Sequence, residues 1–206
     1  MSEFVSEINK IYVDSPLQVK NVNMTTLLFS DGLLSSKANY TITENMLFLK
    51  NQAETSLNLF QFVDSSNYYE FLVNLREKYT VISGSDRYGN KLKKLSDTLL
   101  VFVNGYKLSS SEYILNEQEN TITIKSSYTE KNISTIIIYT SNDAIYEGNV
   151  EDDFSWNSEY NQFLLKDYNV DRYIFFKNGE LLPPNKIQGN SLEDSLARGL
   201  TLNQPP

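Results

Sequence analysis

Three Asx-Gly dipeptides recur along the chain at nearly equal spacing. Asp31-Gly32, Asn104-Gly105 and Asn178-Gly179 each lie between two short runs rich in apolar residues. Asn, Asp and Gly reach the positive φ angles that both central residues of a type I′ turn require, so such a dipeptide is the strongest local signal for a β-hairpin. The three glycines lie at positions 32, 105 and 179, so the two intervals between them are almost identical. Three hairpins in register predict a β module that has been duplicated along the chain.

The similarity extends beyond the turns. Ser35-Ser36 before Tyr40 matches Ser109-Ser110 before Tyr113, and the tyrosines are separated by the same step as the first two glycines. Two later strand-like segments follow at slightly longer steps, which match 46–49 with 121–124 and 59–62 with 136–139. The distance in sequence between matched segments of the two copies increases along the copy. This increase predicts short insertions in the turns, where chains tolerate them. Both copies then end on a Tyr-Glu pair, at 69–70 and 146–147.

The pattern of apolar residues within a copy predicts antiparallel strands. Residues 121–125 alternate polar and apolar, as in a strand with one solvated face, whereas residues 134–140 are rich in Ile and indicate a central strand covered on both faces. Each copy accommodates four or five strands. We therefore expect a mainly β protein, made of tandem small antiparallel β-sandwich or barrel modules with short helical or irregular connectors.

The expected organisation has six segments. They are an N-terminal arm (1–16), a first β module (17–80), a linker (81–97), a second β module (98–147), an acidic and aromatic connector (148–168) and a partial third module (169–206). Within them, residues 69–79 fit a short helix and, nearly as well, a strand. The third copy breaks at Pro183-Pro184, and residues 191–199 predict a brief helix that Gly199 ends.

Histidine and cysteine are both absent from the chain. Without them there is no disulfide, no thiolate or imidazole ligand for a metal, and no catalytic group of the Ser-His-Asp or Cys-His type. The densest acidic group is Glu151-Asp152-Asp153. Such a cluster can bind Ca²⁺ or act in a glycosidase, but a charge run is more typical of a solvated linker. We expect no enzyme activity, no metal and no cofactor.

The charge balance argues against nucleic acid as a partner. The formal net charge is −8, and the nearest basic cluster, Lys91 with Lys93 and Lys94, is more typical of a solvated connector than of a phosphate-binding surface. No apolar stretch approaches the length of a membrane span, and the N-terminus lacks a basic region followed by an apolar run. We expect a protein made in a cytoplasm, without a signal peptide or a transmembrane segment.

Aromatic residues are the candidates for an interaction surface. The chain contains 14 Tyr, 11 Phe and one Trp. Tyr and Trp are favoured at interface centres because they bury a large area at a small cost in entropy. For Tyr69, core packing at a module boundary is about as plausible as an interface, and a sugar-binding platform is a further alternative. The candidate interface residues are Tyr68, Tyr69, Phe154, Trp156 and Tyr160.

The second copy resembles a module common in tailed-bacteriophage virion proteins of the tail-fibre, baseplate and neck-appendage type. The resemblance rests on residues 101–108, Glu112-Tyr113 and residues 121–124, and the first copy departs from it at Asp31 and at Ala38-Asn39, where an acidic residue would precede the Tyr. It covers about residues 26–70 and 98–147 well and 173–182 weakly. It implies a virion protein that contacts other virion proteins, as an oligomer in a symmetric assembly.

Three functions remain open at this point. The first is a non-enzymatic structural component of a phage virion, such as a tail, baseplate or neck adaptor or a fibre-attachment protein. The second is a receptor- or glycan-binding module of a phage tail. The third, which the absence of a recurring catalytic pattern disfavours most, is a polysaccharide hydrolase.

Overall fold

The structure is a computed structural model in which strands account for most of the regular elements. It describes residues 4–11, 17–19, 25–50, 56–62, 67–74, 79–93, 95, 99–125, 133–140, 154–157, 162–165, 176–181, 187–188 and 201–202. The chain divides into two compact units, Met1–Ile145 and Tyr146–Pro206. The described residues include no helix of seven or more residues, and the sheets are small and antiparallel, so the predicted fold class is confirmed. Within the same residues no closed barrel forms.

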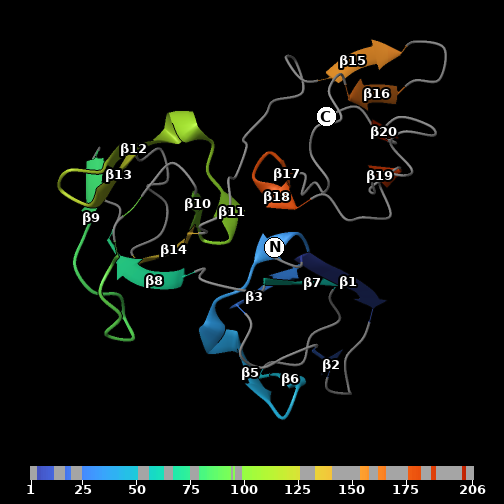
Figure 1. The fold of residues 1–206 in the computed structure, drawn as a ribbon, viewed down its shortest axis with the longest axis horizontal. Helices are drawn as coiled ribbons and strands as arrows, with labels where there is room; N and C mark the ends of the chain where they lie inside the picture. Colours follow the sequence, from blue (N-terminus) through green and yellow to red (C-terminus); the bar gives the residue numbers. More distant parts are fainter. Residues whose placement is uncertain are drawn as a thin grey trace. The chain divides into compact units, whose positions relative to one another are not determined.

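The first module comprises strands β1 to β7 and forms two sheets (Figure 1). The strand order is β1-β7-β3-β4 in one sheet and β2-β6-β5 in the other. A short 3-10 helix, η1 (Lys37–Asn39), precedes β5. The strands are β1 (Phe4–Ile11), β2 (Leu17–Gln18), β3 (Thr25–Ser30), β4 (Leu33–Leu34), β5 (Tyr40–Thr43), β6 (Met46–Leu49) and β7 (Ser56–Phe62).

The second module comprises strands β8 to β14 and repeats this topology. Its strand orders, β8-β14-β10-β11 and β9-β13-β12, are those of the first module with every label raised by seven. A second 3-10 helix, η2 (Ser110–Glu112), occupies the position of η1. The strands are β8 (Asn67–Val73), β9 (Tyr79–Ile82), β10 (Leu99–Val103), β11 (Tyr106–Lys107), β12 (Tyr113–Asn116), β13 (Thr121–Lys125) and β14 (Ser134–Thr140).

Each module has its own hydrophobic core. In the first module the core contains Val19, Leu28, Tyr40, Leu47, Leu57 and Leu59. In the second module it is larger and contains Tyr69, Phe71, Ile82, Leu92, Leu95, Leu99, Val101, Val103, Leu108, Ile122, Ile124, Ile136 and Ile138. Consecutive residues of β10 and most of those of β14 are buried, because both strands are covered on both faces. The prediction of a central strand at 134–140 is therefore confirmed.

The predicted hairpin turns are present at all three Asx-Gly dipeptides. The φ angles are 49° and 82° at Asp31-Gly32, 51° and 90° at Asn104-Gly105, and 51° and 82° at Asn178-Gly179. Each dipeptide joins two antiparallel strands, which are β3 with β4, β10 with β11, and β17 (Phe176–Lys177) with β18 (Glu180–Leu181). The left-handed conformation of both residues is the one that a type I′ turn requires.

The strand register corrects one detail of the sequence repeat. Leu28 lies opposite Leu59, and its equivalent in the second copy, Val101, lies opposite Ile138. The structural equivalent of Leu59 is thus Ile138, whereas the match by sequence was Ile136. A shift of two residues preserves which side chains face the core, so the apolar pattern cannot detect it.

The register of β6 and β13 agrees with the sequence repeat. Leu49 lies opposite Tyr40, and Ile124 lies opposite Tyr113. The predicted match of 46–49 with 121–124 is therefore confirmed.

The pairing of the strands divides the chain differently from the predicted segments. β1 lies in the expected N-terminal arm but pairs with β7. β8 lies entirely inside the expected first module but pairs with β14 of the second. Within residues 69–79 the described part is extended and not helical. Tyr68 and Glu70 alternate with Tyr69 and Phe71 on opposite faces of β8, and all four are buried, as expected for a strand that is covered on both sides.

The C-terminal unit contains a further group of strands. They form a sheet in the order β15-β16-β20-β19. Its strands are β15 (Phe154–Asn157), β16 (Gln162–Leu165), β20 (Thr201–Leu202) and β19 (Ile187–Gln188). Of the partial third module, the structure also describes the hairpin of β17 and β18. The helix predicted at 191–199 lies outside the described residues. Among the residues that the structure does describe, no helix is long and apolar enough to cross a bilayer.

Candidate functional site: the junction between the two modules

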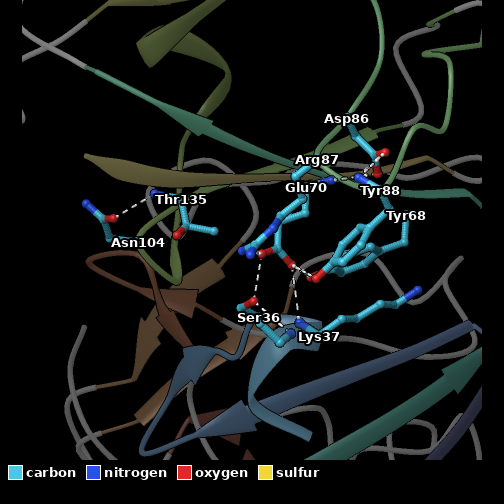
Figure 2. A network of polar contacts seen from close by, with 10 residues as sticks. Ser36, Lys37, Tyr68, Glu70, Asp86, Arg87, Tyr88, Asn104 and Thr135 are labelled. Carbon is cyan, nitrogen blue, oxygen red and sulfur yellow. Dashed lines mark hydrogen bonds and ion pairs between the residues drawn. The ribbon is translucent and has the colours of Figure 1, made fainter. Parts of the chain in front are cut away.

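A buried carboxylate marks the place where the second module contacts the first. Glu70 lies on β8, and its side chain is fully buried. A carboxylate out of contact with water is costly unless it is paired with a cation and accepts several hydrogen bonds. Its surroundings provide both, and Figure 2 shows the donors converging on the two carboxylate oxygens from different parts of the chain.

Three donors come from the second module itself. Arg87 forms an ion pair with Glu70, with Nη1 at 2.9 Å from Oε1. The hydroxyl of Tyr68 donates to Oε2 at 3.0 Å, and that of Tyr88 reaches the same oxygen at 3.5 Å. These contacts neutralise the charge of the carboxylate and fix its orientation.

Two further donors come from the first module. The hydroxyl of Ser36 donates to Oε1 of Glu70 at 2.6 Å, and the backbone N–H of Lys37 donates to Oε2 at 3.2 Å. Ser36 is the N-cap of η1 and also accepts a hydrogen bond from Ala38 N–H. The first N–H groups of a helical turn have no partner within the turn, so a carboxylate is a favourable ligand for them. Glu70 therefore caps η1 from the neighbouring module.

The equivalent turn of the second module supplies its own carboxylate. Glu112 closes a capping box around Ser109, whose N–H donates to Oε2 of Glu112 at 2.8 Å. In the first module the residue at that position is Asn39. The first copy thus departs from the repeat pattern at Ala38-Asn39, where it lacks a local carboxylate. Glu70 of the second module supplies the carboxylate for this turn instead.

A loop of the second module, residues 83–93, holds Glu70 from the other side. It lies in the connection from β9 to β10, which is much longer than the connection from β2 to β3 in the first module. Asp86, which is 6% exposed, organises this loop by accepting hydrogen bonds from Tyr88 N–H (3.0 Å), Asn90 N–H (2.8 Å) and the Asn90 side chain (3.1 Å). The loop is thereby fixed in one conformation next to β8.

The same loop covers the outer edge of β8. The N–H of Glu70 donates to Oδ2 of Asp86 at 3.3 Å, and the N–H of Arg87 donates to the Glu70 carbonyl at 2.9 Å. β8 is an edge strand, since β14 is its one strand partner among the described residues. Edge strands expose backbone groups that can pair with another chain, and a covering loop prevents this.

A second contact between the modules lies at the Asn104-Gly105 turn. The N–H of Leu34 in β4 donates to the Gly105 carbonyl at 3.0 Å. A Cβ atom at Gly105 would lie 2.9 Å from Leu33 Cβ and 3.0 Å from the Leu34 carbonyl oxygen, so this approach requires glycine. The rings of Phe29 and Phe102, one from each module, pack edge to face with centroids 6.0 Å apart. The junction combines an apolar contact with hydrogen bonds.

The side chain of Asn104 fixes the turn to its own sheet. Its Oδ1 accepts a hydrogen bond from Thr135 N–H at 3.1 Å, its Nδ2 donates to Ser134 Oγ at 3.2 Å, and its own N–H donates to the Thr135 carbonyl. Asn104 and Thr135 appear together in Figure 2. The turn that contacts the first module is thus held by contacts within the second module.

The electrostatics around Glu70 favour neutral tyrosines. Burial raises the pKa of Tyr68, Tyr40 and Tyr88, and the negative charge of Glu70 raises each of these pKa values further. Desolvation lowers the pKa of Lys37, and the attraction of Glu70 and Asp86 opposes this effect. The Lys37 ammonium lies 4.1 Å from the centre of the Tyr68 ring, in a cation–π contact.

The candidate interface residues that the structure describes fully are buried. Tyr68 is 8% exposed and belongs to the junction. Tyr69 is 2% exposed, lies in the core of the second module and accepts a hydrogen bond from Lys93 N–H at 3.1 Å. Phe154 and Trp156 lie on β15, whose side chains are outside the described part, as is Tyr160.

The residues around the Glu70 carboxylate, apart from Tyr68, were not predicted as site residues from the sequence. They are Ser36, Lys37, Glu70, Asp86, Arg87 and Tyr88. One signal was available, because a glutamate in the middle of a nearly continuous aromatic and apolar run is unusual unless it is paired. Another was Asp86 shortly before Gly89, since an Asp that accepts hydrogen bonds from its own loop is typical of a tight turn.

An apolar row lies on the outer face of the sheet β9-β13-β12. Ile114 lies opposite Thr123, which lies opposite Val81, and the exposed fractions of Ile114 and Val81 are 49% and 60%. Tyr79, 49% exposed, lies on the same strand as Val81, opposite Lys125. In the first module the position of Ile114 is taken by Thr41.

The described residues contain no group of three or more acidic side chains that could hold a metal ion. Glu151-Asp152-Asp153 lies outside them. No protein-family model matches the sequence of this chain, and no curated protein matches it at a significant level.

Proposed function

We propose that the chain is a non-enzymatic structural component of a bacteriophage virion, acting through protein–protein contacts as a tail, baseplate or neck adaptor or a fibre-attachment protein. The resemblance of residues 98–147 to a module of tailed-phage virion proteins supports this. So does the tandem arrangement of two β modules with the same topology, because repetition of one small unit is an economical way to build an extended scaffold.

The way in which one module binds the next is the observation that carries the proposal. Glu70 reaches the N-terminal turn of η1, and Gly105 approaches β4 through its backbone. A module of this type therefore offers a surface that another β module can recognise. A protein that acts by assembly needs such surfaces more than it needs a catalytic cleft.

The exposed apolar row of Ile114 and Val81, with Tyr79 beside it, supports an additional contact with another protein. Apolar side chains concentrated on one solvated sheet face are a feature of interaction surfaces. Tyr79 and Tyr88, which is 48% exposed, also favour the alternative of a glycan- or receptor-binding module, because an exposed aromatic ring can stack on a sugar.

The direct test is to locate the full chain in a virion. A particle purified from a host whose phage encodes the chain with an affinity label should carry that label in the tail, baseplate or neck, at a fixed copy number, when it is viewed by electron microscopy. Purified particles that lack the chain would contradict the proposal. Glycan-array binding by the full chain, together with its absence from the structural framework, would favour the alternative.

A further inference from the structure

We propose that Glu70 and the loop of residues 83–93 act as a clamp that makes the two β modules one cooperative folding unit. The two modules have separate hydrophobic cores, and the buried rings of Phe29 and Phe102 add an apolar contact to the hydrogen bonds where the modules meet. Two sandwiches with separate cores, joined by a short connection, would ordinarily be able to unfold one at a time. The clamp concerns the folding of these two modules and is independent of whether the protein belongs to a virion.

The carboxylate of Glu70 is shared between the modules. Its two oxygens accept hydrogen bonds from Arg87 and Tyr68 of the second module and from Ser36 and Lys37 of the first. If the first module unfolded alone, Glu70 would lose two donors while its remaining contacts still held it in place. Opening of the first module is therefore opposed by the loss of two charge-assisted hydrogen bonds to a carboxylate of the second.

All of these partners donate hydrogen bonds to Glu70. A glutamine at position 70 has nearly the same shape, but its amide nitrogen would face either Arg87 or the Lys37 N–H, depending on its orientation, and neither of these groups can accept a hydrogen bond. A role in packing alone would tolerate this substitution. A role as the shared acceptor would not.

The second module provides an internal comparison. Glu112 also binds the N-terminal part of a 3-10 turn, but both partners lie within one module. Ser109 corresponds to Ser36, and its hydroxyl contacts Ser111 of its own turn. The pairs Ser36–Glu70 and Ser109–Glu112 thus share a local role, but only the first pair joins the two modules.

The test measures the opening of each module separately in the full chain. Hydrogen exchange with mass spectrometry, carried out along a urea series, reports on peptides within residues 25–50 and 99–125. In the unsubstituted protein both sets should lose protection at the same urea concentration. In Glu70→Gln and in the milder Ser36→Ala, the first module should lose protection at a lower urea concentration than the second.

The matched controls are Glu112→Gln and Ser109→Ala, which leave the clamp intact and should therefore shift both modules together. The clamp is refuted if Ser36→Ala leaves the two modules opening together, or if Ser109→Ala separates them to the same extent. It is also refuted if the unsubstituted protein already opens its modules one after the other. Because Ser36→Ala removes a single hydroxyl, a failure of Glu70→Gln to fold leaves the test intact.

Discussion

At the scale of single residues, the junction depends on the absence of a side chain at Gly105 as much as on the carboxylate of Glu70. Gly105 has a φ of +90°, and the space beside its Cα is filled by Leu33 and the Leu34 backbone. The sequence identifies Gly105 as a turn residue from its pairing with Asn104. It could not show that the same glycine also allows a second module to approach, because that requirement is set by residues far away in the sequence.

Replacement of Gly105 by alanine should destabilise the protein for two separable reasons. The positive φ costs an alanine about 1–2 kcal/mol, and the clash with Leu33 and Leu34 should add about 1–3 kcal/mol. Gly89→Ala is the matched control, because Gly89 has a φ of +84° but no atom lies within 4 Å of the position that its Cβ would take. Urea denaturation should show a larger loss for Gly105→Ala. Equal losses would mean that the close approach contributes nothing.

The buried tyrosine at the junction makes stability fall in alkaline solution. The pKa of Tyr68 in the folded protein is raised above its ordinary value of 10.0, first by burial and then by Glu70. As the pH rises past this ordinary value, the unfolded chain binds fewer protons than the folded protein, so the free energy of unfolding decreases. Urea midpoints measured between about pH 9 and pH 11 should fall with pH. In Tyr68→Phe the slope should be smaller, and an unchanged slope would exclude Tyr68 as the cause.

At the scale of elements, the strands and turns could be predicted well because their signals are local. Positive φ at Asx-Gly and the alternation in 121–125 depend on neighbours within a few residues. The division into modules was less predictable, since the membership of β1 and β8 depends on pairing with β7 and β14 across long separations. The loop of residues 83–93 lies in a segment predicted to be a linker, but its role depends on the partner that it covers.

The loop should depend on Asp86 in a graded way. Asp86→Ala removes the acceptor for four hydrogen bonds, including the one from Glu70 N–H. Asp86→Asn keeps one oxygen for the N–H groups of Tyr88 and Asn90. Its amide nitrogen, however, faces the two donors at the other oxygen, which are the Glu70 N–H and the Asn90 side chain. We expect the alanine variant to lose about 2–3 kcal/mol of stability and the asparagine variant about 1 kcal/mol. Amide exchange of residues 84–92 should accelerate more in the alanine variant, and the reverse order would contradict this expectation.

At the scale of the whole molecule, the contact between the modules has a symmetric and an asymmetric part. Phe29 and Phe102, which pack together, occupy equivalent positions of the two copies, and β4 contacts its own equivalent, β11. The hydrogen bonds join different surfaces. The first contributes β4 and η1, and the second contributes β8, its loop and the Asn104-Gly105 turn. A contact of this kind gives the pair a direction along the chain. The topology of the two modules was predictable as a repeat, whereas this direction arises from differences between the copies, such as Asn39 in place of Glu112.

Association with other proteins should depend on the exposed apolar row. Val81→Asp and Ile114→Asp place charges where the side chains are largely solvated, so the fold and the thermal midpoint should change little. Binding to purified virion partners in a sedimentation or pull-down assay should weaken. Thr41→Asp, at the equivalent position of the first module, should leave binding unchanged. Undiminished binding of both charged variants would show that this face is not the contact surface.

The asymmetry of the clamp also bears on how such a chain can grow by duplication. Glu70 and the loop that neutralises it are encoded close together, within residues 67–93, so an extra copy of the second module would arrive with its own carboxylate for attachment. An extra copy of the first would not, because in β1 the corresponding position falls within the register shift between Glu7 and Lys10. The turn that receives the carboxylate must also lack one of its own, and in the second module Glu112 already caps the equivalent turn. Lengthening of the array through copies of the second module should therefore also require the replacement of Glu112 in the preceding copy.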